Sequence, residues 1–266
     1  MRAALFDMDG VLYNAEDPIP GAAEALQWIR AQAIPHLFAT NTSSRGADAL
    51  AKKLARFGIS AEPDTILTPC EVAADWLRAH ADGPAALFVL PAAREAFHGV
   101  DQVPADAESR ARYIVIGDLG AAWDFATLNR AFRLLHSDPD ATLIALGMTR
   151  FWKGPSGISL DVAPFVAALE HATGRKPLVF GKPAAAFFEG AAQRLGIEPA
   201  DILMVGDDIH TDIAAAQAAG MKAALVRTGK FRPSDLSGTV QPDAVLESVA
   251  DLPAYWMQHW PQNRGE

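Results

Sequence analysis

The chain has 266 residues, half of them hydrophobic and 21% charged, which supports a folded core of one large domain or two modest ones. Its net charge of −9 argues against a nucleic-acid surface and against general attraction to anionic membranes. Cys70 is the only cysteine, which excludes an intrachain disulfide, favours a reducing cytoplasmic location and indicates a small core residue. The sequence shows no secretion signal and no run of about 18 apolar residues, so no membrane span is predicted.

Short apolar runs alternate with amphipathic helical stretches, a pattern typical of a parallel sheet covered on both faces. We predict an α/β fold with a doubly wound core and an inserted second domain. The predicted strands are 3–6, 36–39, 65–67, 86–90, 113–117, 143–146, 178–180, 202–205 and 223–226. The predicted helices are 21–33, 46–57, 69–79, 124–136, 161–173, 184–195 and a stretch ending at Gly220. A turn signal at 82–84 predicts a core of 1–81 and 177–266, interrupted by an inserted α/β domain, 82–176.

The first strand runs directly into two carboxylates, Asp7 and Asp9, followed by Gly10. Residues i and i+2 of an extended chain project to the same side, and glycine allows a sharp turn at the end of a strand. Ligands gather beyond the carboxyl ends of strands in open α/β sheets. The motif alone is equally well explained as a solvated Asp-Gly turn, so its interpretation depends on the rest of the chain.

Three further predicted core strands also end in polar residues. Thr40, Asn41 and the hydroxyls after them suit an anion at a helix start, although an ordinary helix cap explains them as well. Lys182 lies between a glycine and a helix-opening proline, and by itself resembles any surface lysine. Three carboxylates, Asp207, Asp208 and Asp212, follow a wholly apolar strand, and such a cluster is costly unless a cation lies among them. Together the four segments predict Mg²⁺ and a phosphoryl-transfer site.

In this order, the four segments resemble the four motifs of the haloacid dehalogenase superfamily, over nearly the whole chain. The inserted domain is similar to the α/β cap (C2 type) of its subclass IIA. Two further segments, 156–164 and 226–235, resemble the phospholysine phosphohistidine inorganic pyrophosphate phosphatase group. The resemblance implies a Mg²⁺-dependent phosphatase that acts on a small phosphorylated compound.

The resemblance also implies a role for each motif residue. Asp7 is expected to be the nucleophile that forms an aspartyl-phosphate, and Asp9 the general acid and base. The ligands of Mg²⁺ are expected to be Asp7, the main-chain carbonyl of Asp9, and Asp207. Phosphoryl oxygens are expected to bind Thr40, the Asn41 backbone and Lys182, which also orients Asp7. Asp208 and Asp212 are expected to support these ligands without touching the metal.

Specificity is expected to lie in the inserted domain, which we expect to cover the site and admit only small molecules. The segment 147–156 is the candidate loop for selecting the leaving group, with Arg150, Trp152 and Lys153 as its contact residues. Residues 146–150 stand where many subclass members carry an Asn-x-Asp type segment, and the chain departs from that pattern there. His210 is expected to lie near the site without taking part. A homodimer is possible, and a phosphotransferase, a phosphomutase or a non-catalytic phosphoacceptor module stay as alternatives.

Overall fold

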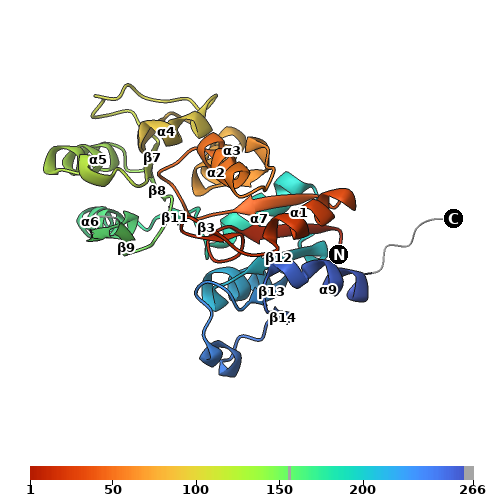
Figure 1. The fold of residues 1–266 in the computed structure, drawn as a ribbon. Helices are drawn as coiled ribbons and strands as arrows, with labels where there is room; N and C mark the ends of the chain where they lie inside the picture. Colours follow the sequence, from red (N-terminus) through yellow and green to blue (C-terminus); the bar gives the residue numbers. More distant parts are fainter. Residues whose placement is uncertain (155–156, 261–266) are drawn as a thin grey trace. The chain divides into compact units, whose positions relative to one another are not determined.

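The computed structural model describes residues 1–154 and 157–260, and its contacts divide the chain into two compact units. Unit 1 comprises Met1–Thr40, Asp48–Leu67 and Phe188–Glu266. Unit 2 comprises Asn41–Ala47 and Thr68–Phe187. Each unit is built around its own parallel sheet (Figure 1). No helix of the described residues is long and apolar enough to cross a membrane.

Unit 1 contains a six-stranded parallel sheet with β1 (Ala3–Asp7) near its centre (Figure 1). β1 pairs with β12 (Ile202–Gly206) on one side and β4 (His36–Ala39) on the other. The order β14-β13-β12-β1-β4-β5 is completed by β5 (Ile66–Leu67), β13 (Lys222–Val226) and β14 (Ala244–Leu246). This strand order confirms the predicted doubly wound core. It also brings the first and the last acidic motifs to neighbouring strands.

The helices of unit 1 bury one apolar face each. α1 (Ala22–Ala31) buries Ala22, Ala25, Leu26 and Ile29, and it packs against α9 (Leu252–His259). The other helices are α2 (Ala47–Arg56), α7 (Ala185–Leu195) and α8 (Ala215–Ala218), preceded by a π-helical turn, Ile209–Ala214. A small hairpin of β2 (Tyr13–Asn14) and β3 (Asp17–Pro18) follows β1. Short 3₁₀ turns span Pro63–Thr65, Pro199–Asp201, Pro233–Ser237 and Val249–Asp251.

Unit 2 contains a separate four-stranded parallel sheet of order β11-β8-β7-β6. Its strands are β6 (Ala85–Phe88), β7 (Tyr113–Ile116), β8 (Thr142–Ala145) and β11 (Leu178–Val179). Its helices are α3 (Pro69–His80), α4 (Pro91–Arg94), α5 (Phe125–Ser137) and α6 (Val162–Thr173), with 3₁₀ turns at Glu95–Phe97 and Gly120–Ala122. The ring of Trp123 stacks on Phe88 and on Phe165, at centroid distances of 6.0 and 4.5 Å. This aromatic stack belongs to a core distinct from that of unit 1.

Two predictions about individual segments are wrong. β11 pairs with β8 of the four-stranded sheet and is therefore not a core strand. Residues 151–154 of the predicted 147–156 loop instead form β9 (Phe151–Gly154), which pairs in an antiparallel hairpin with β10 (Gly157–Leu160), whereas residues 147–150 are irregular. Ser156 of that segment lies outside the described residues, as does the side chain of Lys153. The exact limits of the inserted domain stay a prediction.

Candidate active site

Asp7 lies at the carboxyl end of the central strand of unit 1. All five residues of β1 are buried, because this apolar strand runs between β12 and β4. Its last side chain is therefore a carboxylate held at the sheet edge where open α/β folds bind ligands. Gly10 then turns the chain with a φ of +89°, a conformation that glycine adopts without steric cost.

Three carboxylates gather at this edge. Oxygens of Asp7, Asp207 and Asp212 all lie within 4.8 Å of one another, and all three residues are buried. β12 delivers Asp207 beside Asp7, and the π-helical turn brings Asp212 back over the strand end. Gly206 permits this approach, since a Cβ there would lie 2.3 Å from the Cβ of Asp212. The geometry thus concentrates negative charge in a place that water barely reaches.

Asp207 shows most clearly that this cluster suits a cation. Burial, followed by the charge of Asp7, raises the pKa of Asp207 to about 7. Its Oδ2 accepts a hydrogen bond of 2.7 Å from the Lys230 amide. Its Oδ1 is buried and has no hydrogen-bond partner among the described residues. A buried carboxylate oxygen without a partner is costly, and a bound metal ion would supply that partner. Oxygen-only ligands fit a hard cation such as Mg²⁺.

The loop after β13 closes against both the turn at Gly10, which follows Asp7, and Asp207. The Thr228 hydroxyl donates a hydrogen bond to the Gly10 carbonyl, and the Lys230 amide binds Asp207. Gly229 approaches so closely that a Cβ there would lie 2.6 Å from the Gly10 Cα and 2.1 Å from Asp207 Oδ2. Residues 226–235 showed a family resemblance in the sequence, but no role was predicted for Thr228, Gly229 or Lys230. A Thr-Gly pair two residues after the end of an apolar strand is the signal that could have indicated one.

Asp9 lies at the exposed rim of the same edge. Its Oδ1 accepts a hydrogen bond of 3.3 Å from the amide of Ala15, at the tip of the β2–β3 hairpin. The Gly10 amide donates to the Tyr13 carbonyl at 2.7 Å, which closes the base of this hairpin. The carboxylate of Asp9 is therefore oriented by the hairpin, whereas the cluster is formed by Asp7, Asp207 and Asp212.

Asp208 has a different environment from the three clustered carboxylates. It caps the π-helical turn by accepting hydrogen bonds from the amides of His210 (2.9 Å) and Thr211 (3.0 Å). Burial opposes ionisation of Asp208, but these amides and the Lys230 charge hold its pKa below the ordinary value. The Lys230 Nζ lies 3.6 Å from its carboxylate. His210 is exposed and supplies its backbone amide to this cap.

The residues predicted to bind phosphate are divided between the two units. Thr40 ends the β4 segment of unit 1, is buried, and donates its amide to the Leu67 carbonyl at 3.1 Å. Asn41 and Lys182 belong to unit 2, where two reciprocal hydrogen bonds join them. The Asn41 side-chain amide donates to the Lys182 carbonyl (2.9 Å), and the Lys182 amide donates to Asn41 Oδ1 (2.8 Å). These hydrogen bonds fix together two segments that are 141 residues apart in the sequence, and one of them carries the buried Lys182.

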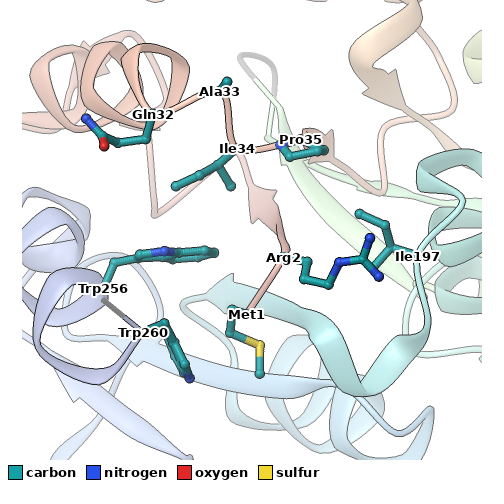
Figure 2. Close-up of a pocket in the computed structure, with 9 residues that line it drawn as sticks. All are labelled: Met1, Arg2, Gln32, Ala33, Ile34, Pro35, Ile197, Trp256 and Trp260. Atoms are coloured by element: carbon teal, nitrogen blue, oxygen red, sulfur yellow. The ribbon is translucent and has the colours of Figure 1, made fainter. Parts of the chain in front are cut away.

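A separate pocket of about 540 Å³ lies at the opposite, amino end of the core sheet. Arg2 precedes β1 and Pro35 precedes β4, so the pocket opens where these parallel strands begin (Figure 2). Two indoles, Trp256 and Trp260, face it (Figure 2). None of its lining residues is a carboxylate, and the acid cluster lies at the other end of β1. The candidate active site is therefore identified by its charged groups and not by cavity size.

Cys70 is buried, as predicted for a core residue. Burial and then the Glu71 charge raise the pKa of its thiol to about 12, so the reactive thiolate is scarce at neutral pH. Its sulfur donates to the Ser43 carbonyl. Both features favour packing over nucleophilic chemistry.

Comparison with known proteins agrees with this arrangement. Residues 4–102 match the model of the haloacid dehalogenase-like hydrolases, and residues 179–252 match a second model described as HAD-hydrolase-like. The chain belongs to the haloacid dehalogenase-like hydrolase family, with the subclass IIA organisation that the sequence predicted. It is an enzyme, a phosphatase of that family.

Similar proteins cover nearly the whole chain. The human phospholysine phosphohistidine inorganic pyrophosphate phosphatase is 34% identical over 97% of this chain and 95% of its own length. The bovine haloacid dehalogenase-like hydrolase domain-containing protein 2 is 36% identical over 88% of this chain and 87% of its own. The structure of a 4-nitrophenylphosphatase from Thermotoga maritima has a TM-score of 0.84 at 27% identity, over 96% of this chain and 97% of that one.

Proposed function

We propose that this phosphatase hydrolyses a small phosphorylated compound through an aspartyl-phosphate on Asp7. The observation that carries the proposal is the buried cluster of Asp7, Asp207 and Asp212, with one Asp207 oxygen lacking a partner among the described residues. A nucleophile beside a cation site at the carboxyl end of a central strand is suited to attack on a phosphoryl group. The family membership of the chain supports the same chemistry.

The proposed reaction has two displacements at phosphorus. A carboxylate oxygen of Asp7 forms a bond to phosphorus, and the bond from phosphorus to the leaving atom breaks; this atom is oxygen in a phosphate ester or pyrophosphate and nitrogen in a phosphoramidate. Asp9 gives its proton to that atom, so the leaving group departs protonated. Water then attacks the phosphorus of the aspartyl-phosphate and loses a proton to Asp9, and the bond to Asp7 breaks. Inorganic phosphate is released, and both carboxyl groups return to their initial states.

The proposed metal is Mg²⁺, held by Asp7, Asp207 and the main-chain carbonyl of Asp9. When bound, Mg²⁺ supplies positive charge that offsets the charge of a phosphoryl group. Asp212 lies close enough to the other two carboxylates to hold the metal directly or to orient Asp207. Asp208 is engaged as a cap by two backbone amides, which supports our prediction that it acts outside the direct ligands.

The proposed contacts to phosphoryl oxygens are the Thr40 hydroxyl, the Asn41 backbone and the Lys182 ammonium. The reciprocal hydrogen bonds between Asn41 and Lys182 support this role, because they fix the Asn41 segment beside the buried Lys182. A lysine in such a place binds an anion as a point charge.

The proposed substrates are small molecules. Two of the similar proteins named above act, by their names, on phospholysine, phosphohistidine and inorganic pyrophosphate, or on 4-nitrophenyl phosphate. The hairpin β9–β10 carries two of the residues proposed to select the leaving group, and its Trp152 is 45% exposed. An exposed indole can stack on a ligand, which supports a contact role.

Release of inorganic phosphate tests the proposal. Purified protein is incubated with Mg²⁺ and a panel of p-nitrophenyl phosphate, pyrophosphate, phospholysine, phosphohistidine and sugar phosphates. We expect hydrolysis of at least one compound, loss of that activity in Asp7→Asn, and a fall of about 10²–10⁴-fold in Asp9→Asn. Transfer of the phosphoryl group to an added alcohol in place of water would identify a phosphotransferase. Full activity in Asp7→Asn would refute the mechanism.

A further inference from the structure

The hairpin that orients Asp9 is attached to helix α2 by a buried lysine. Lys53 projects from α2, and its side chain is only 10% exposed. Its Nζ lies 3.4 Å from the Glu16 carboxylate and 4.0 Å from the centre of the Tyr13 ring. Glu16 belongs to the turn of the β2–β3 hairpin, and Tyr13 to its first strand. One ammonium group therefore contacts both parts of the hairpin.

A buried ammonium group requires compensation for lost hydration. Here the carboxylate of Glu16 and the face of a buried tyrosine ring provide it, through an ion pair and a cation–π contact. The Tyr13 ring also packs on Phe57 at a centroid distance of 5.4 Å, so it does not move freely. Arg56 adds a second ion pair to Glu16 at 3.2 Å, but both side chains are largely exposed. Lys53 therefore depends more on Glu16 than Arg56 does, because the Lys53 side chain is buried whereas that of Arg56 reaches water.

The constraint on Glu16 is transmitted to Asp9 by the neighbouring residue. Ala15 precedes Glu16 and adopts a φ of +52°, which is unfavourable for a residue with a side chain. In this conformation its amide donates to Asp9 Oδ1. Releasing Glu16 would allow Ala15 to relax toward negative φ. Its amide would then turn away from the Asp9 carboxylate.

We propose that Lys53, with Glu16 and Tyr13, positions the general acid Asp9 by holding the β2–β3 hairpin in its strained form. Lys53 is a positioning residue and does not touch the substrate. This inference rests on the proposed function of Asp9. Its consequence is specific to proton donation, because the hydrogen bond that the hairpin gives through the Ala15 amide is accepted by Asp9.

Two aryl phosphates of similar shape separate proton donation from general damage. The leaving group of p-nitrophenyl phosphate, p-nitrophenolate, is a weak base and departs with little help from an acid. Phenolate is a stronger base, so phenyl phosphate requires a proton on its leaving oxygen. The value of kcat/KM reports the first displacement. We therefore expect Lys53→Met to reduce kcat/KM for phenyl phosphate roughly ten-fold more than for p-nitrophenyl phosphate, less than the ~10²-fold that a 1 Å misplacement can cost.

Three further variants complete the experiment. Asp9→Asn should change the ratio of the two rates in the same direction and further. Glu16→Gln, at a largely exposed position, should change the ratio of the two rates in the same direction as Lys53→Met. It therefore tests the inference even if Lys53→Met folds poorly. Lys52→Met removes the exposed neighbouring lysine and should leave the ratio unchanged. Circular dichroism and thermal unfolding establish that each variant is folded.

The outcomes are distinct. A wild-type protein that hydrolyses neither ester, nor any compound of the panel, would overturn the proposed function and this inference with it. An active wild type in which folded Lys53→Met and Glu16→Gln both keep the wild-type ratio would overturn this inference alone. Reduced thermal stability with an unchanged ratio would show that the lysine only supports the fold.

Discussion

Replacing Gly229 by alanine tests whether the close contact between the β13 loop and Asp207 holds the site together. The added Cβ would lie 2.1 Å from Asp207 Oδ2 and 2.6 Å from the Gly10 Cα. The carboxylate would have to retreat by about 1 Å to reach a tolerable contact, because real Cβ contacts shorter than 3.0 Å essentially do not occur. That movement breaks the hydrogen bond from the Lys230 amide.

The expected loss of stability has two parts. A left-handed φ of +66° costs alanine about 1–2 kcal/mol. Loss of a hydrogen bond to a charged group costs about 1.5–3 kcal/mol more. We therefore expect Gly229→Ala to lower the free energy of unfolding by about 2.5–5 kcal/mol and to reduce kcat by about 10²-fold through misplacement of Asp207.

Gly196→Ala is the matched control. Gly196 has nearly the same φ, +64°, but nothing lies within 4 Å of its Cβ position. This variant should lose only the backbone contribution of about 1–2 kcal/mol and keep its kcat. Urea denaturation and initial rates on the best substrate of the panel measure both quantities. Equal destabilisation of the two variants, with activity retained in both, would refute the reasoning.

Three other predictions concern single groups. Chelation should abolish activity and Mg²⁺ should restore it, with Ca²⁺ a poor replacement because its coordination is looser; undiminished turnover after exhaustive EDTA treatment would contradict this. The metal-free protein should lose stability as pH rises from about 4 to about 7, by at most ~1.4 kcal/mol per pH unit, because the folded-state pKa of Asp207 is raised and the unfolded chain binds fewer protons in that range. Asp207→Asn should flatten this slope in thermal melts at several pH values, and an unchanged slope would assign it to other groups. Cys70 should react with a thiol reagent at pH 8 only after unfolding, since its pKa is raised to about 12, and fast labelling of native protein would exclude the buried position.

The sequence predicted the core well because the relevant signals are local. Residues 3–6 are wholly apolar and end in Asp7, which indicates a buried strand that delivers a carboxylate to the sheet edge. The apolar run of β12 carries the same kind of signal, and the structure confirms that strand. The predicted helix 21–33 is confirmed over Ala22–Ala31, whereas Ala33 lies beyond its end, exposed and with a φ of +52°. The alternation of such elements also predicted a parallel sheet without any knowledge of its strand order.

Pairing partners and close approaches could not be predicted in this way. β11 has only two residues, both half-buried, so nothing in its own sequence distinguishes one sheet from the other. The approach of Asp212 to Asp7 depends on a π-helical turn, whose wider spacing is not encoded in an apolar periodicity. The Lys53 contact joins residues about 40 positions apart and was not expected from the sequence.

The exposed hairpin of unit 2 has a consequence for the behaviour of the protein in concentrated solution. Large apolar side chains cover it, with exposed fractions from 45% to 76% at Phe151, Trp152, Ile158 and Leu160. Within the described part of the chain, its two strands pair only with each other, so their outer backbone groups face solvent. Such edges recruit further strands when molecules crowd together. Self-association on concentration or heating should therefore begin at this hairpin, and a lysine in place of Ile158 should raise the solubility limit without any effect on the acid cluster.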